Sequence, residues 1–497
     1  MTRRPPLVIV TLPGRSVAEL RGEIIEARNA GADGAEVRLD RLAPRELALL
    51  PELFPAPLPL LATLRSRVEG GEGPDDVASR IERLLPLGAL PFEWIDLEYD
   101  RDRDLTGQLR PPGGTILSSH LAAADLPDLD RRMRQPVPSG SVRKVVIPAS
   151  IATLLDRVIP ALPPLGETSL VVLTTGASGP LLRAWSGRLG NPLVFASLPQ
   201  GGPREGSRSP VEPGQIPADR LRWFLDADEA APVFGIAGHP VGHSASPYLH
   251  SRWMRHAGHR GLYVPLDFAS DEEFVDSLPV LADRGFRGLN VTHPFKQAAF
   301  AAASRVGRGA EACGVANCLT FRGGEVEAEN TDLAAMLRRL EELRNSGLWG
   351  GRSVTVLGAG GAARATLAAA KSLGAGLHLV ARRPEAARAL EESFGAGTGT
   401  PPAPRPGDLV VHATDAGRAG AGALDLPFAS LVGPGVHVLD WVYRPDEPTI
   451  RSVAEAGGAT YEDGWRLLVY QAASSFDVWW GAPPSDVEIA ATVGEGV

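Results

Sequence analysis

Residues 353–365 read SVTVLGAGGAARA, a β-branched run that leads directly into a glycine-rich turn. The turn has the pattern G-x-G-x-x-A, with Gly358, Gly360 and Ala363 in the three marked places. Glycines allow the backbone to approach a pyrophosphate, and the N-terminus of a following helix stabilises the phosphate charge. Small residues continue to about Ser372, so we predict a strand–turn–helix unit that binds a dinucleotide.

The residues after the next strand indicate which dinucleotide is bound. The run LHLV (377–380) ends in Ala381-Arg382-Arg383. An NAD site has Asp or Glu at about this place for the ribose hydroxyls, whereas arginines suit the 2′-phosphate of NADP. We predict NADP as the cofactor, with two solvated arginines as the alternative interpretation. The predicted contacts are Gly358, Ala359, Gly360, Gly361, Ala362, Arg382 and Arg383.

The first half of the chain has a different rhythm from the second. Short apolar, β-branched runs recur about every 20–30 residues, with helix-like stretches between them. Eight such runs over about 225 residues predict a (β/α)8 TIM barrel, with an open doubly wound sheet as the alternative. The runs are 7–12, 34–40, 58–65, 93–99, 115–120, 143–149, 170–175 and 193–198.

The fold class predicted for the whole chain is α/β: a TIM barrel followed by a two-lobed α/β unit with a Rossmann-like NADP-binding domain. The polar segment 199–216 is expected to be a lid over the barrel, and 226–232 a linker. A C-terminal helix is expected at 464–481. The predicted domains are 1–226 for the barrel, 232–332 for substrate binding, 333–460 for NADP, and 461–497 as a helical segment that returns to the substrate domain.

Composition limits the classes of partner. The chain has 497 residues, with 50 Lys and Arg against 59 Asp and Glu, and a net charge of −9. This balance argues against nucleic acid or an anionic membrane as the main partner. Two cysteines are too few for a disulfide framework or a four-thiolate zinc site. No signal peptide or spanning segment is visible, so we expect the cytoplasm. Nothing in the sequence predicts the oligomeric state.

Lysine is rare in this chain, which draws attention to the few that occur. Only three of the 50 basic residues are lysines: Lys144, Lys296 and Lys371. A lysine can lose its proton and act as an amine nucleophile, whereas an arginine cannot. The first 238 residues hold only Lys144 and one histidine, His120, on neighbouring predicted strands. Lys371 falls in the middle of a predicted helix and is expected to face solvent.

Two further patterns suggest a site in the second half. Lys296 follows NVTHPF, and Asp332 begins a predicted helix; the pair could transfer the proton that accompanies hydride transfer, although Asp332 could equally be an N-cap. Ser244 and Ser246 precede a proline and could bind a carboxylate or cap the helix. The spacing of the nearby histidines does not suit a metal, so no metal site is predicted.

Taken together, the motifs of residues 232–497 resemble those of shikimate dehydrogenases. The resemblance rests on GHPVGHSASPYLH (238–250), LNVTHPFK (289–296), ENTD (329–332) and the nucleotide turn. It implies that Lys296 and Asp332 are catalytic and that Thr414 belongs to the cofactor wall. There are two departures from the family. Ala381-Arg382-Arg383 replaces the usual Asn-Arg-Thr, so that one adenosine contact is lost and Arg383 could add a phosphate contact, and His412 stands where Asn is usual. The implied substrate contacts are Ser244 and Ser246 for the carboxylate, and Asn290, Thr292, Asn317, Gln471 and the nearby Tyr443 for the ring hydroxyls.

Residues 5–225 resemble type I 3-dehydroquinate dehydratases. The supporting segments include GADGAEVRLD (31–40), ATLRSRVEGG (62–71) and RKVVIPAS (143–150). The resemblance implies that Lys144 forms a Schiff base and that His120 is the general acid–base, oriented by Glu98. One departure is Val211, where the family usually has a lid serine. The implied substrate contacts are Glu36, Arg38, Arg65, Arg183 and Gln215.

The two resemblances support each other, because the product of the first family is the substrate of the second. They imply a bifunctional lyase and oxidoreductase of the shikimate pathway, which leads to chorismate and the aromatic amino acids. Its substrates would be 3-dehydroquinate, 3-dehydroshikimate and shikimate. Three alternatives remain: a quinate/shikimate dehydrogenase with an idle barrel, a non-catalytic binding protein, and a Schiff-base aldolase fused to an unrelated reductase.

Overall fold

The structure of the chain is a computed structural model, and it describes residues 5–162, 169–199, 211–226, 231–417, 426–443 and 449–495. The centre of the predicted lid (200–210) and most of the predicted linker (227–230) lie outside the described residues. Within the described parts, no helix is both long and apolar enough to cross a bilayer. The chain divides into two compact units: residues 1–235 with 240–243 and 258–285, and residues 236–239 and 244–257 with 286–497.

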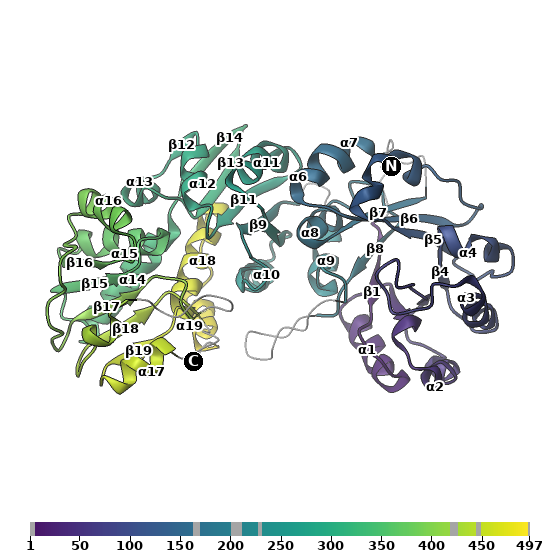
Figure 1. Cartoon of the computed structure of the whole chain (residues 1–497), viewed down its shortest axis with the longest axis horizontal. Coiled ribbons are helices and arrows are strands. Elements are labelled where there is room, and N and C mark those ends of the chain that lie inside the picture. Colours follow the sequence, from purple (N-terminus) through teal and green to yellow (C-terminus); the bar gives the residue numbers. More distant parts are fainter. Residues whose placement is uncertain are drawn as a thin grey trace. The chain divides into compact units, whose positions relative to one another are not determined.

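The first unit contains the predicted barrel (Figure 1). Eight parallel strands pair in the order β7-β6-β5-β4-β3-β2-β1-β8. A side chain links the two end strands, because Nδ2 of Asn191, just before β8, donates to the carbonyl of Val172 in β7 at 3.3 Å. The strands are β1 (Leu7–Thr11), β2 (Gly34–Arg38), β3 (Leu60–Thr63), β4 (Trp94–Glu98), β5 (Thr115–His120), β6 (Val142–Pro148), β7 (Leu170–Thr175) and β8 (Leu193–Ala196). The predicted barrel is confirmed.

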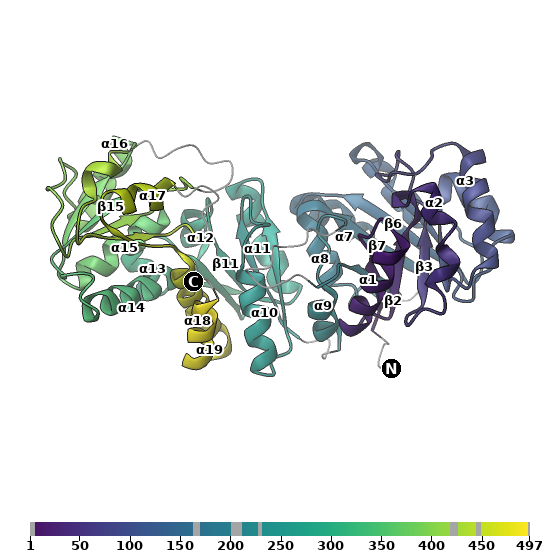
Figure 2. The ribbon, with the colours of Figure 1, turned by 90° about the horizontal axis from the view of Figure 1, so that it is seen from below.

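Helices connect the strands along the outside of the barrel. The first helix, α1 (Val17–Asn29), begins at a capping box in which Ser16 and Glu19 exchange hydrogen bonds. Its buried residues recur every three or four positions, so one face packs on the strands, next to β2 (Figure 2). The other helices of this half are α2 (Pro44–Leu47), α3 (Val77–Leu84), α4 (Tyr99–Asp102), α5 (Leu129–Met133), α6 (Ile151–Thr153), α7 (Ile159–Ala161), α8 (Gly179–Ala184) and α9 (Ala218–Leu225).

A six-stranded sheet follows, with the strand order β10-β9-β11-β13-β14-β12. The pairs β11–β13 and β13–β14 are antiparallel. The strands are β9 (Val233–Gly238), β10 (Leu262–Asp267), β11 (Phe286–Val291), β12 (Arg305–Val306), β13 (Cys318–Arg322) and β14 (Glu325–Glu329). The helices of this region are α10 (Ser246–His256), α11 (Asp271–Asp283), α12 (Lys296–Ala302) and α13 (Arg308–Cys313).

The last sheet contains the glycine-rich turn. Its five strands are all parallel and lie in the order β16-β15-β17-β18-β19. They are β15 (Ser353–Leu357), β16 (Gly376–Val380), β17 (Leu409–His412), β18 (His437–Asp440) and β19 (Thr460–Glu462). Because β15 has β16 on one side and β17 on the other, the chain reverses direction across the sheet at β15. Dinucleotides bind beyond the carboxyl ends of the strands at such a switch point.

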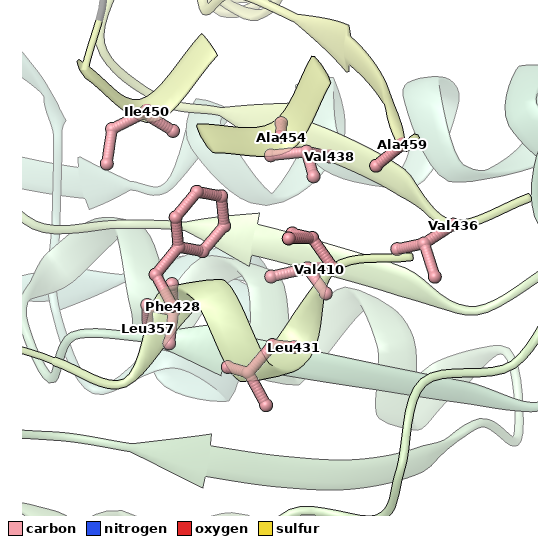
Figure 3. Packing of buried hydrophobic residues seen from close by; sticks show 10 residues of the cluster. Leu357, Val410, Phe428, Leu431, Val436, Val438, Ile450, Ala454 and Ala459 are labelled. Atoms are coloured by element: carbon pink, nitrogen blue, oxygen red, sulfur yellow. The ribbon is translucent and has the colours of Figure 1, made fainter. Parts of the chain in front are cut away.

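Helices and a buried apolar cluster support this sheet. The helices are α14 (Thr331–Asn345), α15 (Gly361–Ser372), α16 (Pro384–Phe394), α17 (Thr449–Ala456), α18 (Trp465–Trp480) and α19 (Asp486–Gly494). Figure 3 shows Val410 and Val438 of the strands packed with Phe428, Ile450 and Ala454 from segments that cover them. Each large side chain fully buried in this way contributes about 1.5–3 kcal/mol. The cluster therefore fixes the strands whose ends form the nucleotide crevice.

The C-terminal helix α18 returns to the substrate-binding elements. It packs along α14 and α10, and Ser475 on α18 accepts a hydrogen bond at 2.7 Å from Asn290 of β11. This packing supports the predicted return of residues 461–497. The four-part domain division made from the sequence remains a proposal.

Candidate active sites

The barrel lysine lies in the barrel interior, among charged side chains. Lys144 on β6 is 4% exposed, and its Nζ donates to Oδ2 of Asp96 at 3.2 Å. The ammonium also sits over the ring of Phe195, 3.8 Å from the ring centre. A carboxylate and an aromatic face thus both contact the amino group of Lys144.

Asp96 is also bound to Arg65. Nη2 of Arg65 donates to Oδ1 of Asp96 at 2.8 Å, and Ser118 Oγ donates to the same oxygen at 2.5 Å. Burial by itself would raise the pKa of Asp96, but the charges of Arg65 and Lys144 hold this pKa below its ordinary value. Asp96 is therefore an ionised carboxylate in contact with both Arg65 and Lys144.

The carboxylate that reaches His120 belongs to Glu69. Oε2 of Glu69 lies 3.1 Å from Nδ1 of His120 and also accepts the backbone N–H of His120 at 3.1 Å. Arg65 donates to the same oxygen at 3.0 Å. Burial in the barrel, followed by the positive charges of Arg65 and Lys144, lowers the pKa of His120 well below its ordinary value. A neutral imidazole at this place can accept a proton.

Glu98, to which we assigned the orientation of His120, lies in a different set of contacts. Its Oε1 accepts the backbone N–H of Ser66 at 2.7 Å, and its Oε2 accepts from Arg101 at 3.1 Å. In this structure the carboxylate in contact with His120 is thus that of Glu69, and the orienting role of Glu98 stays a prediction. The physical reason is that Glu98 ends β4 and faces the backbone turn after β3, whereas Glu69 lies in that turn and reaches across to the end of β5.

The remaining predicted substrate contacts of the barrel come together around Lys144. Glu36 accepts from Thr11 and Thr63, each at 2.7 Å. Gln215 donates to Thr11 at 2.9 Å, while its buried Oε1 has no hydrogen-bond partner in the described structure. One pocket is lined by Thr11, Glu36, Arg38, Thr63, Arg65, His120, Lys144, Val146, Leu173, Thr175, Arg183, Phe195, Glu212 and Gln215.

Two arginines of this pocket already have partners. Arg38 binds Asp40 through two hydrogen bonds of 2.9 Å, and it binds Glu212 at 2.7 Å. Arg183 donates to backbone carbonyls, including that of Phe195 at 3.0 Å, and burial lowers its pKa to about 10. Glu212 was not singled out from the sequence, since its pairing with Arg38 joins residues 174 positions apart. Val211 is described next to it, whereas the nearby Ser209 lies outside the described residues.

The second site contains the other predicted lysine. Nζ of Lys296, the first residue of α12, lies 2.6 Å from Oδ2 of Asp332 in the first turn of α14. The helix N-cap is Asn330, which accepts the backbone N–H of Leu333 at 3.0 Å. Asp332 is therefore not the cap, and its carboxylate is bound to the lysine. This pair can donate or accept a proton at the ammonium nitrogen.

The two predicted serines lie at the start of α10. Ser244 Oγ accepts the backbone N–H of Ser246 at 3.2 Å. Ser246 is fully buried, and its Oγ has no hydrogen-bond partner in the described structure. Tyr443 lies close by, because its OH accepts the backbone N–H of Ala245 at 3.4 Å. A buried hydroxyl without a partner costs free energy, so this site suits an added acceptor such as a carboxylate.

The other predicted substrate contacts of the second half differ in how far the protein itself already engages their side chains. Asn290 donates to Ser475 at 2.7 Å, and Asn317 accepts from the backbone N–H of Thr331 at 2.7 Å, so both amides are partly engaged by the protein. Gln471 is buried on α18 and donates to its own helix at 3.1 Å. Thr292 is half-buried at the end of β11, and no side-chain hydrogen bond is recorded for it within the described parts.

The glycine-rich turn has the geometry that a pyrophosphate requires. Gly358 has φ of +112°, and a Cβ there would lie 2.6 Å from the carbonyl of Ala413. At Gly360 no atom lies within 4 Å of the Cβ position, so this face of the turn is open. Arg382 and Arg383 are exposed just after β16. Ala359 and Ala362 are half-buried in the same turn, and Lys371 is exposed as expected.

Comparisons with known proteins show the families of the two halves. Residues 8–232 match the family model of type I 3-dehydroquinase, and residues 236–319 match that of the shikimate dehydrogenase substrate binding domain. The NADP(+) shikimate dehydrogenase of Acidiphilium cryptum is 39% identical over 258 residues, which cover 51% of this chain and 92% of that protein. The chain belongs to the shikimate dehydrogenase family. Its first half adds a type I 3-dehydroquinase domain.

Further shikimate dehydrogenases agree in extent. The NADP(+) shikimate dehydrogenase of Gluconobacter oxydans is 37% identical over 256 residues, covering 50% of this chain and 90% of that protein. A crystal structure of shikimate 5-dehydrogenase from Thermus thermophilus, in complex with NADP(H) and shikimate, is 30% identical. It covers 54% of this chain and all of that chain, with a TM-score of 0.46.

One residue in contact with His120, Glu69, was given no role in the sequence reasoning, although its signal was present. Glu69 lies four residues after Arg65 in the segment ATLRSRVEGG, within the stretch that carried the resemblance. The turn that brings it to His120 is held by Asp40, whose Oδ2 accepts the backbone N–H of Glu72 at 3.0 Å. An acidic residue inside a segment that carries a family resemblance is thus a better candidate for the partner of His120 than one chosen only because it ends a strand.

Proposed function

We propose that this chain catalyses two consecutive reactions of the shikimate pathway. The barrel dehydrates 3-dehydroquinate to 3-dehydroshikimate, and the second half reduces 3-dehydroshikimate to shikimate with NADPH. The observation that carries the proposal is that each half has one lysine in contact with a carboxylate: Lys144, which lines the barrel pocket, with Asp96, and Lys296 with Asp332.

In the barrel, we assign the Schiff base to Lys144. Its amine attacks the ketone carbon and water leaves, so that the resulting iminium draws electrons from the neighbouring carbon. His120, kept neutral by burial, takes the proton from that carbon and then protonates the departing hydroxyl, which leaves as water. Hydrolysis of the imine consumes one water and regenerates Lys144. Glu69 stabilises the imidazolium through Nδ1, as an acidic partner does in hydrolase triads.

The other barrel residues bind the substrate. Arg183 and Gln215 suit the carboxylate and a neighbouring hydroxyl, because Gln215 keeps an unpaired amide oxygen in the pocket. Glu36 and Arg65 remain candidates for ring hydroxyls. Arg38 is held by Asp40 and Glu212, so its contact with substrate requires that Glu212 shares or releases it. Glu98 is assigned a supporting role through Ser66.

In the second half, Ser244 and Ser246 bind the substrate carboxylate, and Asn290, Thr292, Asn317, Tyr443 and Gln471 surround the ring. Lys296 protonates the carbonyl oxygen as it becomes a hydroxyl, and Asp332 holds its ammonium at 2.6 Å. NADPH, when bound, supplies the hydride. The residues fit this cofactor because Gly360 leaves an open cradle and because Arg382 and Arg383 stand exposed beyond β16, where a 2′-phosphate would need them. Gly358, Ala359, Gly361, Ala362 and Thr414 complete the proposed wall.

A coupled assay tests the proposal directly. The full chain with 3-dehydroquinate and NADPH should produce shikimate and consume one NADPH per product. Lys144→Arg should abolish dehydration but keep the reduction of added 3-dehydroshikimate, and Lys296→Arg should do the reverse. Loss of both activities in either variant would contradict the assignment. Absence of dehydration in the wild type would instead identify an idle barrel attached to a shikimate or quinate dehydrogenase.

The net charge of −9 argues against nucleic acid or an anionic membrane as a partner. It does not contradict the small anionic substrates proposed as partners, because the barrel pocket contains Arg38, Arg65, Lys144 and Arg183. The cytoplasm remains the location that we predict.

A further inference from the structure

A chain of buried hydrogen bonds leads from the core of the nucleotide-binding sheet to its crevice. His412 ends β17, is fully buried, and has Nδ1 2.7 Å from Oδ1 of Asp440. Its other ring nitrogen, Nε2, lies 2.5 Å from Oγ1 of Thr414. Thr414 is half-buried, and it is the member of this series of hydrogen bonds that lies toward the crevice.

The hydrogen-bond partners of Asp440 fix the direction of this chain. The buried carboxylate accepts the backbone N–H of Val442 at 2.8 Å and the hydroxyl of Tyr461 at 3.0 Å. Burial, followed by the charge of Asp440, raises the pKa of Tyr461, so that its hydroxyl keeps the proton and donates it. A carboxylate accepts only, and Nδ1 of His412 must therefore carry a proton and donate as well.

The tautomer of His412 then determines to which group the Thr414 hydroxyl donates its proton. In a neutral imidazole with Nδ1 protonated, Nε2 is an acceptor, and the Thr414 hydroxyl donates its only proton to it. The oxygen of Thr414 also accepts the backbone N–H of Ala416 at 3.2 Å. One lone pair remains on this oxygen, so Thr414 offers an acceptor and no donor to a ligand.

The position of Thr414 indicates which part of a dinucleotide it meets. Its Cγ2 lies 3.0 Å from the Cβ position at Gly358, the first glycine of the turn. It follows β17, on the side of β15 opposite to β16 and Arg382. A dinucleotide that lies across this switch point with its 2′-phosphate near Arg382 places its nicotinamide half near Thr414.

We propose that His412 is a positioning residue for the nicotinamide half of NADP: it holds the Thr414 hydroxyl with a lone pair toward the ligand. The partner group is then a donor, namely a ribose hydroxyl or the carboxamide NH₂, and a pyrophosphate oxygen is excluded because it is itself an acceptor. This inference rests on the proposed NADP site and adds a function for a residue at which the chain departs from its family.

The test measures binding rather than turnover. Titrations of the full chain with NADP+ and with adenosine 2′,5′-bisphosphate, which lacks the nicotinamide half, separate the two ends of the site. Thr414→Val and His412→Asn should each weaken NADP+ binding by about 3–10-fold, the effect of one hydrogen bond. Neither should change the affinity for the bisphosphate. Thr414→Ser keeps the hydroxyl and should bind both ligands as the wild type does.

Further measurements keep the proposal distinct from a structural role. Because His412 acts through Thr414, the double variant should bind NADP+ no more weakly than Thr414→Val alone. In ¹⁵N NMR spectra, the ring of His412 should show a protonated Nδ1 and an unprotonated Nε2. Additive losses, equal losses for the bisphosphate, or protonation of both nitrogens at neutral pH would overturn the inference. Failure of the wild type to bind the bisphosphate would instead overturn the NADP site itself.

Discussion

Oε2 of Glu69 lies 3.1 Å from Nδ1 of His120 and accepts the backbone amide of the same residue. One oxygen therefore fixes both the ring and the backbone of the proposed general base. The contact also fixes the tautomer, because Nδ1 donates to Glu69 and leaves Nε2 to face the pocket. This relationship separates two glutamates that the sequence alone could not rank.

The first prediction compares those glutamates. Glu69→Gln removes the charge that stabilises the imidazolium. We expect kcat for dehydration to fall at least about 10-fold, because general acid–base catalysis as a whole contributes ~10²–10⁴-fold. Glu98→Gln keeps an oxygen for the Ser66 amide, and kcat of the folded enzyme should stay within about threefold of the wild type. Because Glu98 is buried and ion-paired with arginines, the loss of its charge should lower stability rather than act on His120. Steady-state assays of both variants decide the matter, and a larger loss in Glu98→Gln would restore the original assignment.

The second prediction concerns the anchor of Lys144. Asp96→Asn leaves Arg65 and Lys144 without their carboxylate in a buried site, which should destabilise the barrel by about 3–5 kcal/mol. Hydrogen–deuterium exchange of peptides from β4 to β6, measured across a urea series, reports this loss. Asp104→Asn is the matched control, because its side chain is 97% exposed. Equal protection in the two variants would show that the buried network contributes nothing.

The third prediction uses the close approach of α15 to Lys296. A Cβ at Gly361 would lie 2.7 Å from Cδ of Lys296, so Gly361→Ala should displace the lysine from Asp332. A shift of about 1 Å can lower kcat about 10²-fold, and reduction should fall by this order while dehydration is unchanged. Gly360→Ala meets no protein atom within 4 Å, and it should weaken NADPH binding rather than kcat. Unchanged reduction in Gly361→Ala would mean that the flexible lysine adapts.

The fourth prediction tests the selection of NADP. Arg382→Ala and Arg383→Ala each remove a cation proposed to bind the 2′-phosphate, and a hydrogen bond to a charged group contributes about 1.5–3 kcal/mol. The KM for NADPH should therefore rise by about 10–100-fold in at least the Arg382 variant. The KM for NADH should not change. Arg388→Ala, an exposed arginine of the same region, serves as the control. A parallel loss with NADH would point to a general effect on the fold.

The fifth prediction concerns pH and stability. His250 is 1% exposed among aromatic rings, and burial lowers its pKa to about 3. The unfolded chain, with an ordinary histidine pKa of about 6.5, binds the extra proton between these values. The contribution of neutral His250 to the free energy of unfolding is thus fully present above about pH 6.5. It is lost as the pH falls, and the free energy of unfolding should be lower by about 2 kcal/mol at pH 5.

The measurement for this prediction is urea unfolding at pH 7.5 and pH 5, followed by tryptophan fluorescence. His250→Gln does not titrate, so its free energy of unfolding should fall less than that of the wild type between the two pH values. A matched control is His256→Gln, because that histidine is half exposed at the surface. The same pH dependence in the wild type and in His250→Gln would contradict the shift assigned to His250.

Much of the fold followed from periodicity in the sequence. The eight runs of the first half became β1 to β8, because buried parallel strands require continuous apolar segments. The turn after Leu357 became the start of α15, since its glycines adopt the backbone that the turn needs. The rarity of lysine, combined with position, selected Lys144 and Lys296, both of which lie in contact with carboxylates.

The sequence by itself determined which elements form and which side chains can carry chemistry, because those depend on local spacing and on side-chain type. Only the tertiary structure decided which acids and bases meet. Lys144 and Asp96 are 48 positions apart, and His412 and Asp440 are 28 apart. The first pair joins β6 to β4 across β5, and the second joins the neighbouring strands β17 and β18. Contacts made in the same way bring Glu69, rather than Glu98, to His120. Such electrostatic contacts depend on the closure of the barrel and on the register of the sheet, which no local pattern encodes.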